Sequence, residues 1–501
     1  MSLRSLTHIL GLLPLATVVL CTSSICNLLD SQIPGRVVYP VDTTYTALVS
    51  SYYSGYERAL RPSCIFRPTS TAEVSEFVRF INENGNATSS QPQFAVRGGG
   101  HTLFTGAANI QGAVTVDLRS MNSLVLSDDK KTASVGGGSI FSDLYPQLFL
   151  ELESVDSPQE VSAPGILRYN VDFTTETFVG GLNFLSREHG FSCDNIYGYE
   201  VVLANGSIIH ATASSNRDLW LALKGGSNNF GIVTRFDLAT FQQGLMWGGL
   251  VLFNYTDGIV EAEAEAFSTF MDPANFDSAA DMAVILNFAA GSFSIGNSLF
   301  YTKPIANPPV YEPFTSLPSP VVDNLGFNNV SGMVTKFGDS LPSTLNLVSE
   351  MVYSFKNANA TIYGQLFRTW EDGCRALAEI QGLQVQYLVQ PQPVTNGTNS
   401  LGQAAGETDV VIGLVTVAFD NASDQERALG GLRSIVNSHI RVLRNAGLYI
   451  PFKYLNYADK SQDPFSSYGE QRKAHLQTVS RRYDPTGLFQ RGVPGGFKLF
   501  V

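Results

Sequence analysis

The stretch that decides the fold is FAVRGGGHT, residues 94–102. Its apolar start predicts a short strand, and its three glycines predict a tight loop at the end of that strand. Consecutive glycines let the backbone adopt positive φ and bring its N–H groups close to a ligand, as phosphate-binding loops require. Arg97 adds a fixed cation at the mouth of the predicted loop, and His101 follows the glycines. A glycine-rich surface turn has the same local composition, so the neighbouring sequence must decide between the two.

The residues before this stretch predict a helix. Ser70 and Glu73 have the spacing of a capping box, and Gly85 lies where the helix should end. Between them, apolar residues occupy positions 74, 77, 78 and 81, which share one helical face. This helix leads into the predicted strand.

The residues after the loop repeat the pattern. Residues 113–118 predict a second strand, residues 136–138 form a second glycine triplet, and a short amphipathic helix is expected up to Leu148. Alternating helices and strands with glycine loops at the strand ends indicate an α/β nucleotide-type site.

Further motifs follow in a fixed order along the chain. They are LSREHG (185–190), DN (194–195), DLW (218–220), KGG (224–226), NFGIVT (229–234), YLNY (454–457) and YDP (483–485). Together with residues 62–68 and RGGGH (97–101), this series resembles the flavin-linked oxidases of the vanillyl-alcohol-oxidase type, in particular fungal berberine-bridge-enzyme-like oxidoreductases. It covers most of residues 60–235 and 450–490. The resemblance implies an α+β chain with a two-domain, PCMH-type FAD-binding fold.

The resemblance also implies roles for single residues. His101 would carry FAD covalently through the 8-methyl group of the flavin ring, whereas an isolated histidine is more often an ordinary loop residue. Tyr454 would lie on the substrate side of the flavin, with Asn456 beside it, as catalytic or substrate-orienting residues. The residues expected to bind FAD are Arg97, Gly98, Gly99, Gly100, His101, Thr102, Gly180, Gly181, Asn195, Gly231, Ile232, Val233 and Tyr457.

Each of these assignments has a simpler structural alternative. Residues 454–457 read as a half-buried strand, in which tyrosine is common and Tyr454 and Asn456 share a face. A phenol titrates near about pH 10, so Tyr454 would need a neighbouring cation or a hydrogen-bonded partner to act as a base. The glutamate motif that plant relatives use as a base is not found. Residues 225–233 also fit a helix C-cap followed by a strand, and Asn195 fits a turn with local hydrogen bonds.

One segment departs from the family pattern. The family has a glycine-rich run before the LSR motif, but residues 149–179 are charged and irregular, and only Gly180 and Gly181 keep the expected character. This run contains no cysteine, so a second covalent link to the flavin is not expected. A divergent loop and an error in the gene model, which would impair cofactor binding, are both open explanations.

The start of the chain predicts entry into the secretory pathway. Arg4 precedes an apolar run, residues 9–20, that is too short to span a bilayer, so residues 1–23 are interpreted as a cleaved signal peptide of a secreted protein. The resemblance implies a disulfide between Cys26 and Cys64, which an oxidising compartment permits. Seven sequons fit this destination, at Asn86, Asn205, Asn254, Asn329, Asn359, Asn396 and Asn421. Asn205 is equally explained by a hairpin turn, and Cys193 and Cys374 by burial as small apolar residues.

Composition excludes several partners. A net charge of −12 argues against nucleic acid and against anionic membranes. The six histidines lack the spacing of metal ligands, and no nicotinamide or Walker motif is present. A GDSL tetrapeptide at residues 338–341 has no identifiable base. The expected partners are therefore a small-molecule substrate and dioxygen, and the expected state is a monomer.

The motif positions divide the chain. Residues 26–236 are expected to form the FAD-binding domain, residues 237–449 the substrate domain, and residues 450–501 a segment returning to the first domain. Residues 410–419 predict a strand covered on both sides, and residues 425–443 a helix. We expect the substrate domain to be an antiparallel sheet with helices over one face. Residues 304–320 and 391–406 are predicted as surface loops.

These features predict an FAD-dependent oxidase. A carbon that bears a hydroxyl or an amine would deliver hydride to the flavin, and dioxygen would reoxidise it. The substrate domain is rich in Phe and Tyr, which favours a flat metabolite of specialised biosynthesis over a sugar. An oligosaccharide oxidase and a non-catalytic glycoprotein with an impaired flavin site are the alternatives.

Overall fold

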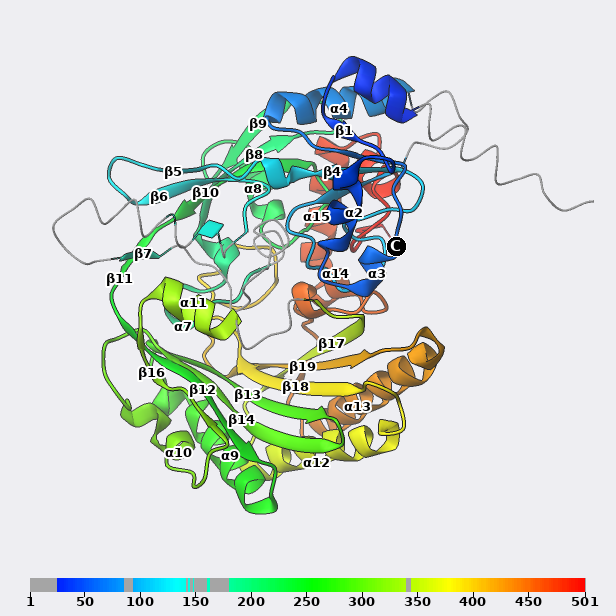
Figure 1. Cartoon of the computed structure of the whole chain (residues 1–501). Coiled ribbons are helices and arrows are strands. Elements are labelled where there is room, and N and C mark those ends of the chain that lie inside the picture. Colours follow the sequence, from blue (N-terminus) through cyan, green and yellow to red (C-terminus); the bar gives the residue numbers. More distant parts are fainter. Residues whose placement is uncertain are drawn as a thin grey trace, which may run out of the picture.

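The computed structural model describes residues 25–84, 93–140, 143–144, 147, 160–162, 180–338 and 344–500. The predicted signal peptide, the sequon at Asn86 and nearly all of residues 149–179 lie outside these ranges, as do most of the helix expected up to Leu148 and most of the GDSL tetrapeptide. Two layers of structure are visible in Figure 1: the N-terminal half with the C-terminal helices, and a large sheet with its own helices.

The first layer begins with a small mixed sheet around the predicted glycine loop. Its strands are β1 (Val37–Val38), β2 (Cys64–Phe66), β4 (Val114–Asp117) and β3 (Phe94–Arg97), in that spatial order. β2 and β3 both run parallel to β4, as a helical crossover requires, and β1 runs antiparallel to β2. The crossover is helix α4 (Thr71–Asn84), whose buried residues include the predicted apolar stripe. The Ser70 hydroxyl accepts the Glu73 N–H (3.3 Å), which confirms the predicted start.

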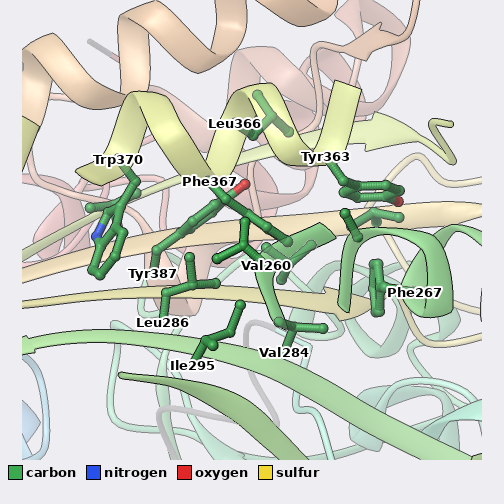
Figure 2. Packing of buried hydrophobic residues seen from close by; sticks show 14 of the residues in the cluster. Val260, Phe267, Val284, Leu286, Ile295, Tyr363, Leu366, Phe367, Trp370 and Tyr387 are labelled. Carbon is green, nitrogen blue, oxygen red and sulfur yellow. The ribbon is translucent and has the colours of Figure 1, made fainter. Parts of the chain in front are cut away.

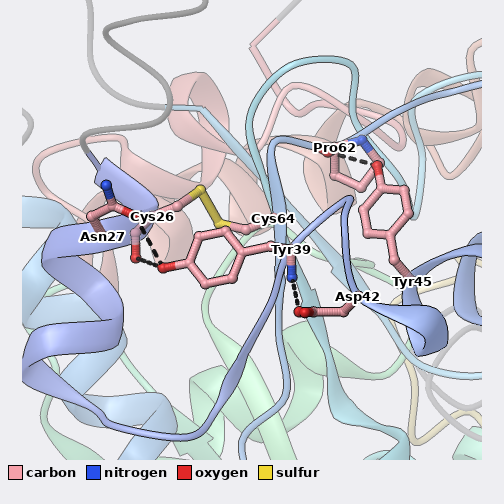
Figure 3. Close-up of a disulfide and its surroundings, with 7 residues drawn as sticks. All are labelled: Cys26, Asn27, Tyr39, Asp42, Tyr45, Pro62 and Cys64. Atoms are coloured by element: carbon pink, nitrogen blue, oxygen red, sulfur yellow. Dashed lines mark hydrogen bonds between the residues drawn. A yellow bond between two sulfur atoms is a disulfide. The ribbon is translucent and has the colours of Figure 1, made fainter.

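A disulfide ties the N-terminus to this sheet. Cys26 and Cys64 are joined, as the resemblance implied, and Figure 3 shows Tyr39 beside them, donating its hydroxyl proton toward the Cys26 carbonyl (3.3 Å). The short helices α2 (Thr43–Ser50) and α3 (Gly55–Arg58) follow. Cys193 and Cys374 are unpaired and fully buried, which confirms their prediction as core residues.

An antiparallel sheet completes the first layer. Its strands, in spatial order, are β5 (Leu124–Leu126), β6 (Thr132–Gly136), β10 (Ile232–Ala239), β8 (Ile196–Val202) and β9 (Ile208–Thr212). The predicted hairpin between β8 and β9 is confirmed, with Gly206 at φ +78° in the turn. Helix α8 (Arg217–Leu223) lies between β9 and β10, and a two-stranded ribbon joins β7 (Glu160–Ser162) to β11 (Phe241–Gln243). A further short helix, α7 (Ser186–His189), precedes β8.

The C-terminal segment returns to this layer. Helix α14 (Pro464–Ser467) and helix α15 (Glu470–Tyr483) lie beside the N-terminal elements in Figure 1. Tyr483 donates a hydrogen bond to Asp218 of α8 (2.9 Å), and Arg482 pairs with the same carboxylate (2.8 Å). The two ends of the sequence therefore build one layer.

The second layer is a large sheet that is antiparallel throughout. Its main order is β15 (Val322–Asp323), β12 (Met246–Asn254), β14 (Ser292–Tyr301), β13 (Ala280–Ala289), β18 (Gln384–Pro391), β19 (Val410–Phe419), β17 (Leu347–Lys356) and β20 (Tyr449–Ile450), with β16 (Gly326–Asn328) also on β12. The strand predicted over residues 410–419 is confirmed, and all but one of its residues are buried.

Helices cover one face of this sheet, as predicted. They are α9 (Asp257–Phe270), α12 (Ala360–Leu377) and α13 (Gln425–Asn445), with α10 (Glu312–Thr315) at one end and α11 (Val330–Gly338) beside β12. Figure 2 shows Phe367 of α12 beside Tyr387 of β18, within a core that also holds Trp370, Val260 and Leu286. The aromatic residues of the second layer are concentrated in this helix-covered core.

One of the two predicted surface loops is wrong. In residues 391–406, Asn399 and Leu401 are 3% and 0% exposed, because polar groups of this loop bond to the first layer. Asn399 donates to the Asp194 carboxylate (2.6 Å), and the Ser400 N–H donates to the Lys224 carbonyl (2.8 Å). Polar composition was mistaken for exposure there. Most of residues 304–320 are exposed, as predicted, although this segment includes two short helical turns and Tyr311 is buried, donating to the Phe300 carbonyl (2.7 Å).

Among the described residues, no helix combines the length and the apolar character needed to cross a membrane.

Candidate functional site

The loop after β3 is held firmly from the protein interior. Of its three glycines, only Gly100 has positive φ (+81°), and a Cβ there would lie 2.7 Å from the Arg97 Nε. The Arg97 guanidinium stacks on the Tyr52 ring (3.6 Å) and donates to the Leu48 carbonyl (2.7 Å), and its side chain is 1% exposed. Burial lowers its pKa. The prediction of a cation at the mouth of the loop is wrong, because Arg97 points inward and anchors the loop.

His101 lies where the loop meets the large sheet. Its ring is half-buried and stacks on Tyr53 (3.8 Å, 16° between planes). Tyr53 in turn packs with Leu103, Val348 of β17 and Ala418 of β19. The loop that carries His101 therefore touches the face of the large sheet opposite to its helices, which we call the inner face.

A buried carboxyl group supports the chain after His101 and Thr102. The Glu57 carboxylate accepts the Ala107 N–H (2.8 Å), and the Ser54 hydroxyl donates to the Leu103 carbonyl (2.9 Å). Glu57 is fully buried, and burial raises its pKa to about 7. These contacts come from α3 and its N-cap and fix the position of the loop.

The predicted glycine pair and the C-terminal tyrosine meet. Gly180 and Gly181 have φ of +134° and +88°, and the Tyr454 hydroxyl accepts the Gly181 N–H (2.8 Å). A Cβ on Gly180 would lie 2.6 Å from the Tyr454 ring, which is 1% exposed. Tyr457 packs edge-on against Tyr454 (5.0 Å). Position 180 therefore requires glycine for two reasons: its positive φ and the close approach of the Tyr454 ring.

The strand predicted over residues 454–457 is wrong. Residues Leu455–Tyr457 form a 3₁₀ turn, because the Tyr457 N–H donates to the Tyr454 carbonyl and closes the chain locally. The turn leaves both polar atoms of the Asn456 amide buried and without a hydrogen-bond partner. An unpaired buried amide is costly, so its position indicates a polar group that a ligand supplies.

The remaining predicted cofactor residues lie at the start of β10 and in the turn before β8, and their side chains are largely buried in the protein. Ile232 and Val233 begin β10 and are 3% and 2% exposed, paired with Val202 and Val201. Gly231 lies so close to β8 that a Cβ would be 2.6 Å from the Val201 side chain. Asn195 donates to the His189 carbonyl (2.8 Å), which confirms the local turn.

The second glycine triplet is a site of close backbone packing. A Cβ on Gly138 would lie 1.8 Å from the Leu118 carbonyl oxygen, and one on Gly137 would lie 2.5 Å from the Val233 carbonyl oxygen. The neighbouring Ser139 hydroxyl is buried without a partner. This loop therefore adds another unpaired polar atom to the first layer.

Sequence reasoning missed Glu350. It lies on the inner face of β17, between Val348, which packs near Leu103, and Val352, which belongs to the same core cluster as Tyr454. It is 6% exposed and faces Thr416 of β19 across the ladder. A carboxylate at an inward position of an otherwise apolar strand was the available signal, but only the sheet shows which face it occupies.

Comparisons with known proteins identify the family of this chain. The family described as FAD binding domain matches residues 62–166. The FAD-dependent monooxygenase CTB5 of Cercospora beticola is 31% identical over 96% of this chain and 92% of the relative. The FAD-dependent monooxygenase tpcD of Cochliobolus heterostrophus is 29% identical over 92% of this chain and 89% of the relative.

The chain belongs to the FAD-linked oxidoreductases. Its structural neighbours are berberine-bridge-enzyme-like and vanillyl-alcohol-oxidase-type proteins, as the motif series indicated. Wild-type Physcomitrella patens BBE-like 1 superposes with a TM-score of 0.76 at 19% identity, covering 96% of this chain and 100% of that one. Glucooligosaccharide oxidase of Acremonium strictum, with a 6-S-cysteinyl, 8α-N1-histidyl FAD, gives 0.72 at 18% identity, covering 94% and 98%. At these identities the superpositions show a shared fold.

The residues of this oxidoreductase fit FAD. The loop of residues 98–102 offers glycine backbone beside buried surfaces, and loops of this kind hold phosphate groups through their N–H donors. The unpaired Asn456 amide has both a donor and an acceptor to offer to the polar edge of a flavin ring. The residues present are therefore compatible with FAD.

Proposed function

We propose that this FAD-linked oxidoreductase oxidises a hydroxyl- or amine-bearing carbon of a small organic substrate, with dioxygen as the final acceptor. When bound, FAD supplies the hydride acceptor and returns to its oxidised form as dioxygen is reduced to hydrogen peroxide. The observation that carries the proposal is that His101 stacks on Tyr53, which packs on Val348 of β17, and that Glu350 is the next residue on the same face of this strand.

His101 is proposed as the covalent attachment point. Its ring is half-buried and held by stacking on Tyr53, so its orientation is restricted before any ligand binds. The 8α-histidyl link of glucooligosaccharide oxidase supports the assignment by analogy of fold. Attachment would prevent loss of the cofactor outside the cell.

Glu350 is proposed to accept the substrate proton, and Tyr454 to orient the substrate. The Tyr454 hydroxyl accepts the Gly181 N–H, and this bond fixes the direction of the phenol ring. Burial disfavours a phenolate, whereas carboxyl groups are ordinarily ionised at neutral pH and can accept a proton. Glu350→Gln should therefore lower the rate of flavin reduction while the flavin content is unchanged. An unchanged reduction rate would remove Glu350 from the reaction.

The cellular setting is proposed to be the secretory pathway, with a role in specialised-metabolite biosynthesis. The Cys26–Cys64 disulfide is compatible with an oxidising compartment, and the fungal relatives are named as FAD-dependent monooxygenases. Those names also suggest a competing reaction, in which an oxygen atom from dioxygen is inserted into the product. Release of one hydrogen peroxide per substrate oxidised supports the oxidase reaction. Transfer of ¹⁸O from labelled dioxygen into the product would show a monooxygenase reaction instead.

The experiment that tests the proposal is flavin retention. The secreted protein is precipitated with acid, the pellet is examined for flavin fluorescence, and the labelled peptide is located by mass. We expect flavin on the His101 peptide and none in His101→Ala. His210→Ala is the matched control, because His210 is an exposed histidine on β9. Folded wild-type protein without flavin would refute the proposal and favour a non-catalytic glycoprotein.

A further inference from the structure

Helix α3 and the two residues before it touch both layers of the molecule. We call residues 53–58 the bracket and residues 98–107, which include His101, the flavin loop. Two hydrogen bonds join them: the Tyr53 N–H donates to the Gly100 carbonyl (3.2 Å), and the Ser54 hydroxyl donates to the Leu103 carbonyl (2.9 Å). The bracket therefore holds the flavin loop on both sides of its histidine.

The bracket also holds the start of β17. Ser54 and Leu345 form an isolated parallel bridge, in which the Leu345 N–H donates to the Tyr53 carbonyl (3.0 Å). The Gly55 N–H donates back to the Leu345 carbonyl (2.9 Å). A Cβ on Gly55 would lie 2.1 Å from the Asn346 carbonyl oxygen, so a side chain at this position would force the two segments apart.

Arg58, the last residue of the bracket, ties these bonds together. Its Nη1 donates to the carbonyls of Tyr52 (2.9 Å) and Tyr53 (2.6 Å), and its Nη2 donates to the Leu345 carbonyl (2.8 Å). One guanidinium therefore joins carbonyls of two segments that lie 287 positions apart in the sequence. A planar, forked guanidinium can serve several acceptors at fixed angles, which a lysine ammonium on a flexible stem cannot reproduce.

The bracket lies between two groups that are proposed to act in the reaction. The Tyr53 ring stacks on His101 (3.8 Å) and packs with Val348 of β17. Glu350 is the next residue on the same face of this strand, about 7 Å beyond Val348. A shift of the bracket would therefore move the flavin loop relative to the strand that carries Glu350.

We infer that Arg58 is a positioning residue, which fixes the spacing between the flavin loop and β17. This inference rests on the proposed function, which gives His101 and Glu350 their roles. One substrate must meet the flavin and Glu350 at the same time, so the two must keep a constant separation. A misplacement of about 1 Å can slow a reaction about a hundredfold, and a rigid connection between the two segments prevents it.

The test is deuterium exchange of the full-length holoprotein, read at the amides of Leu345 and Ala107. Leu345 reports the connection to β17, and Ala107, whose N–H donates to Glu57, reports the flavin loop. In Arg58→Met we expect exchange at both amides to become about tenfold faster, the effect of losing about one hydrogen bond to a charged group. Arg58→Lys should give values between those of Arg58→Met and the wild type.

Arg61→Met is the matched control. Arg61 is exposed, and its guanidinium donates to the carbonyls of Arg58 and Leu60 within its own segment. Exchange at the two reporting amides should change less than about twofold in this variant. The visible circular dichroism of the bound flavin is the second measurement, because it reports the groups around the cofactor and not the stability of the fold. It should change in Arg58→Met and stay at the wild-type values in Arg61→Met.

The outcomes for the inference and for the proposed function are separable. Faster exchange at both amides and an altered flavin spectrum in Arg58→Met, with wild-type values in Arg61→Met, support the inference. Faster exchange at one amide alone, equal effects in the two arginine variants, or an unchanged flavin spectrum overturns it. If Arg58→Met does not fold, Arg58→Lys decides by the same criteria. Wild-type protein without flavin after acid precipitation would refute the proposed function, and exchange at the two amides would still decide whether Arg58 joins the segments.

Discussion

Replacing Tyr454 with phenylalanine separates a structural role of this tyrosine from a role in the reaction. The change removes the acceptor of the Gly181 N–H bond (2.8 Å) at a side chain that is 1% exposed. A buried N–H left without an acceptor costs about 1–3 kcal/mol, so the free energy of unfolding should fall by that amount. If the hydroxyl also bonds the substrate, flavin reduction should slow about tenfold, the equivalent of about 1.4 kcal/mol in the barrier.

Tyr468→Phe is the matched control. The Tyr468 hydroxyl is also buried, at a side chain 4% exposed, and donates to the carbonyl of another glycine, Gly225 (3.2 Å). Both variants should lose similar stability in urea unfolding, but only Tyr454→Phe should slow anaerobic flavin reduction in stopped-flow absorbance. Equal reduction rates in the two variants would restrict Tyr454 to a structural role. Wild-type stability of Tyr454→Phe would refute the calculation from the Gly181 bond.

Two further predictions concern the loops around His101. Burial raises the pKa of Glu57 from 4.5 to about 7, so the folded state holds this proton more tightly than the unfolded state. The protonated carboxyl group stabilises the fold fully below about pH 4.5, and this stabilisation is lost as the pH rises through 7. The total loss is about 3 kcal/mol. Glu57→Gln cannot lose a proton, so the urea midpoints of variant and wild type should diverge between pH 5 and pH 8, roughly the window of the two pKa values. Curves that stay parallel over this range would contradict the raised pKa of Glu57. Gly138→Ala should destabilise by about 1–3 kcal/mol or prevent folding, because its Cβ would lie 1.8 Å from the Leu118 oxygen, whereas Gly258→Ala on α9, with open space around it, should be neutral or stabilising by up to about 1 kcal/mol. Equal thermal stability of these two glycine variants would contradict the packing argument.

The motif series was sufficient for the family and for much of the local structure. The capping box and apolar spacing gave α4, the alternation of residues 410–419 gave β19, and the Asn205-Gly206 pair gave the β8–β9 turn. Each depends on neighbours within a few residues, which is the range that sequence periodicity records. The disulfide came from the resemblance. The role of His101 and the division at residues 236 and 449 stay predictions.

Local pattern failed where long-range contacts set the outcome. The YLNY segment has the composition of a strand, but it has no ladder partner and closes as a 3₁₀ turn under Gly181. Arg97 is charged, yet stacking on Tyr52 and bonds to the Leu48 carbonyl draw it inside. The loop of residues 391–406 looked exposed because its hydrogen-bond partners, Asp194 and Lys224, are about two hundred residues away.

By itself, then, the sequence determined that this chain belongs to the FAD-linked oxidoreductases and where several of its glycine loops and strands lie, because those motifs act through contiguous backbone. Only the tertiary structure decided which side chains form the site. Strand registers place Glu350 and Thr416 on the inner face and turn Tyr387 away from it, and register is fixed by pairing between strands far apart in sequence.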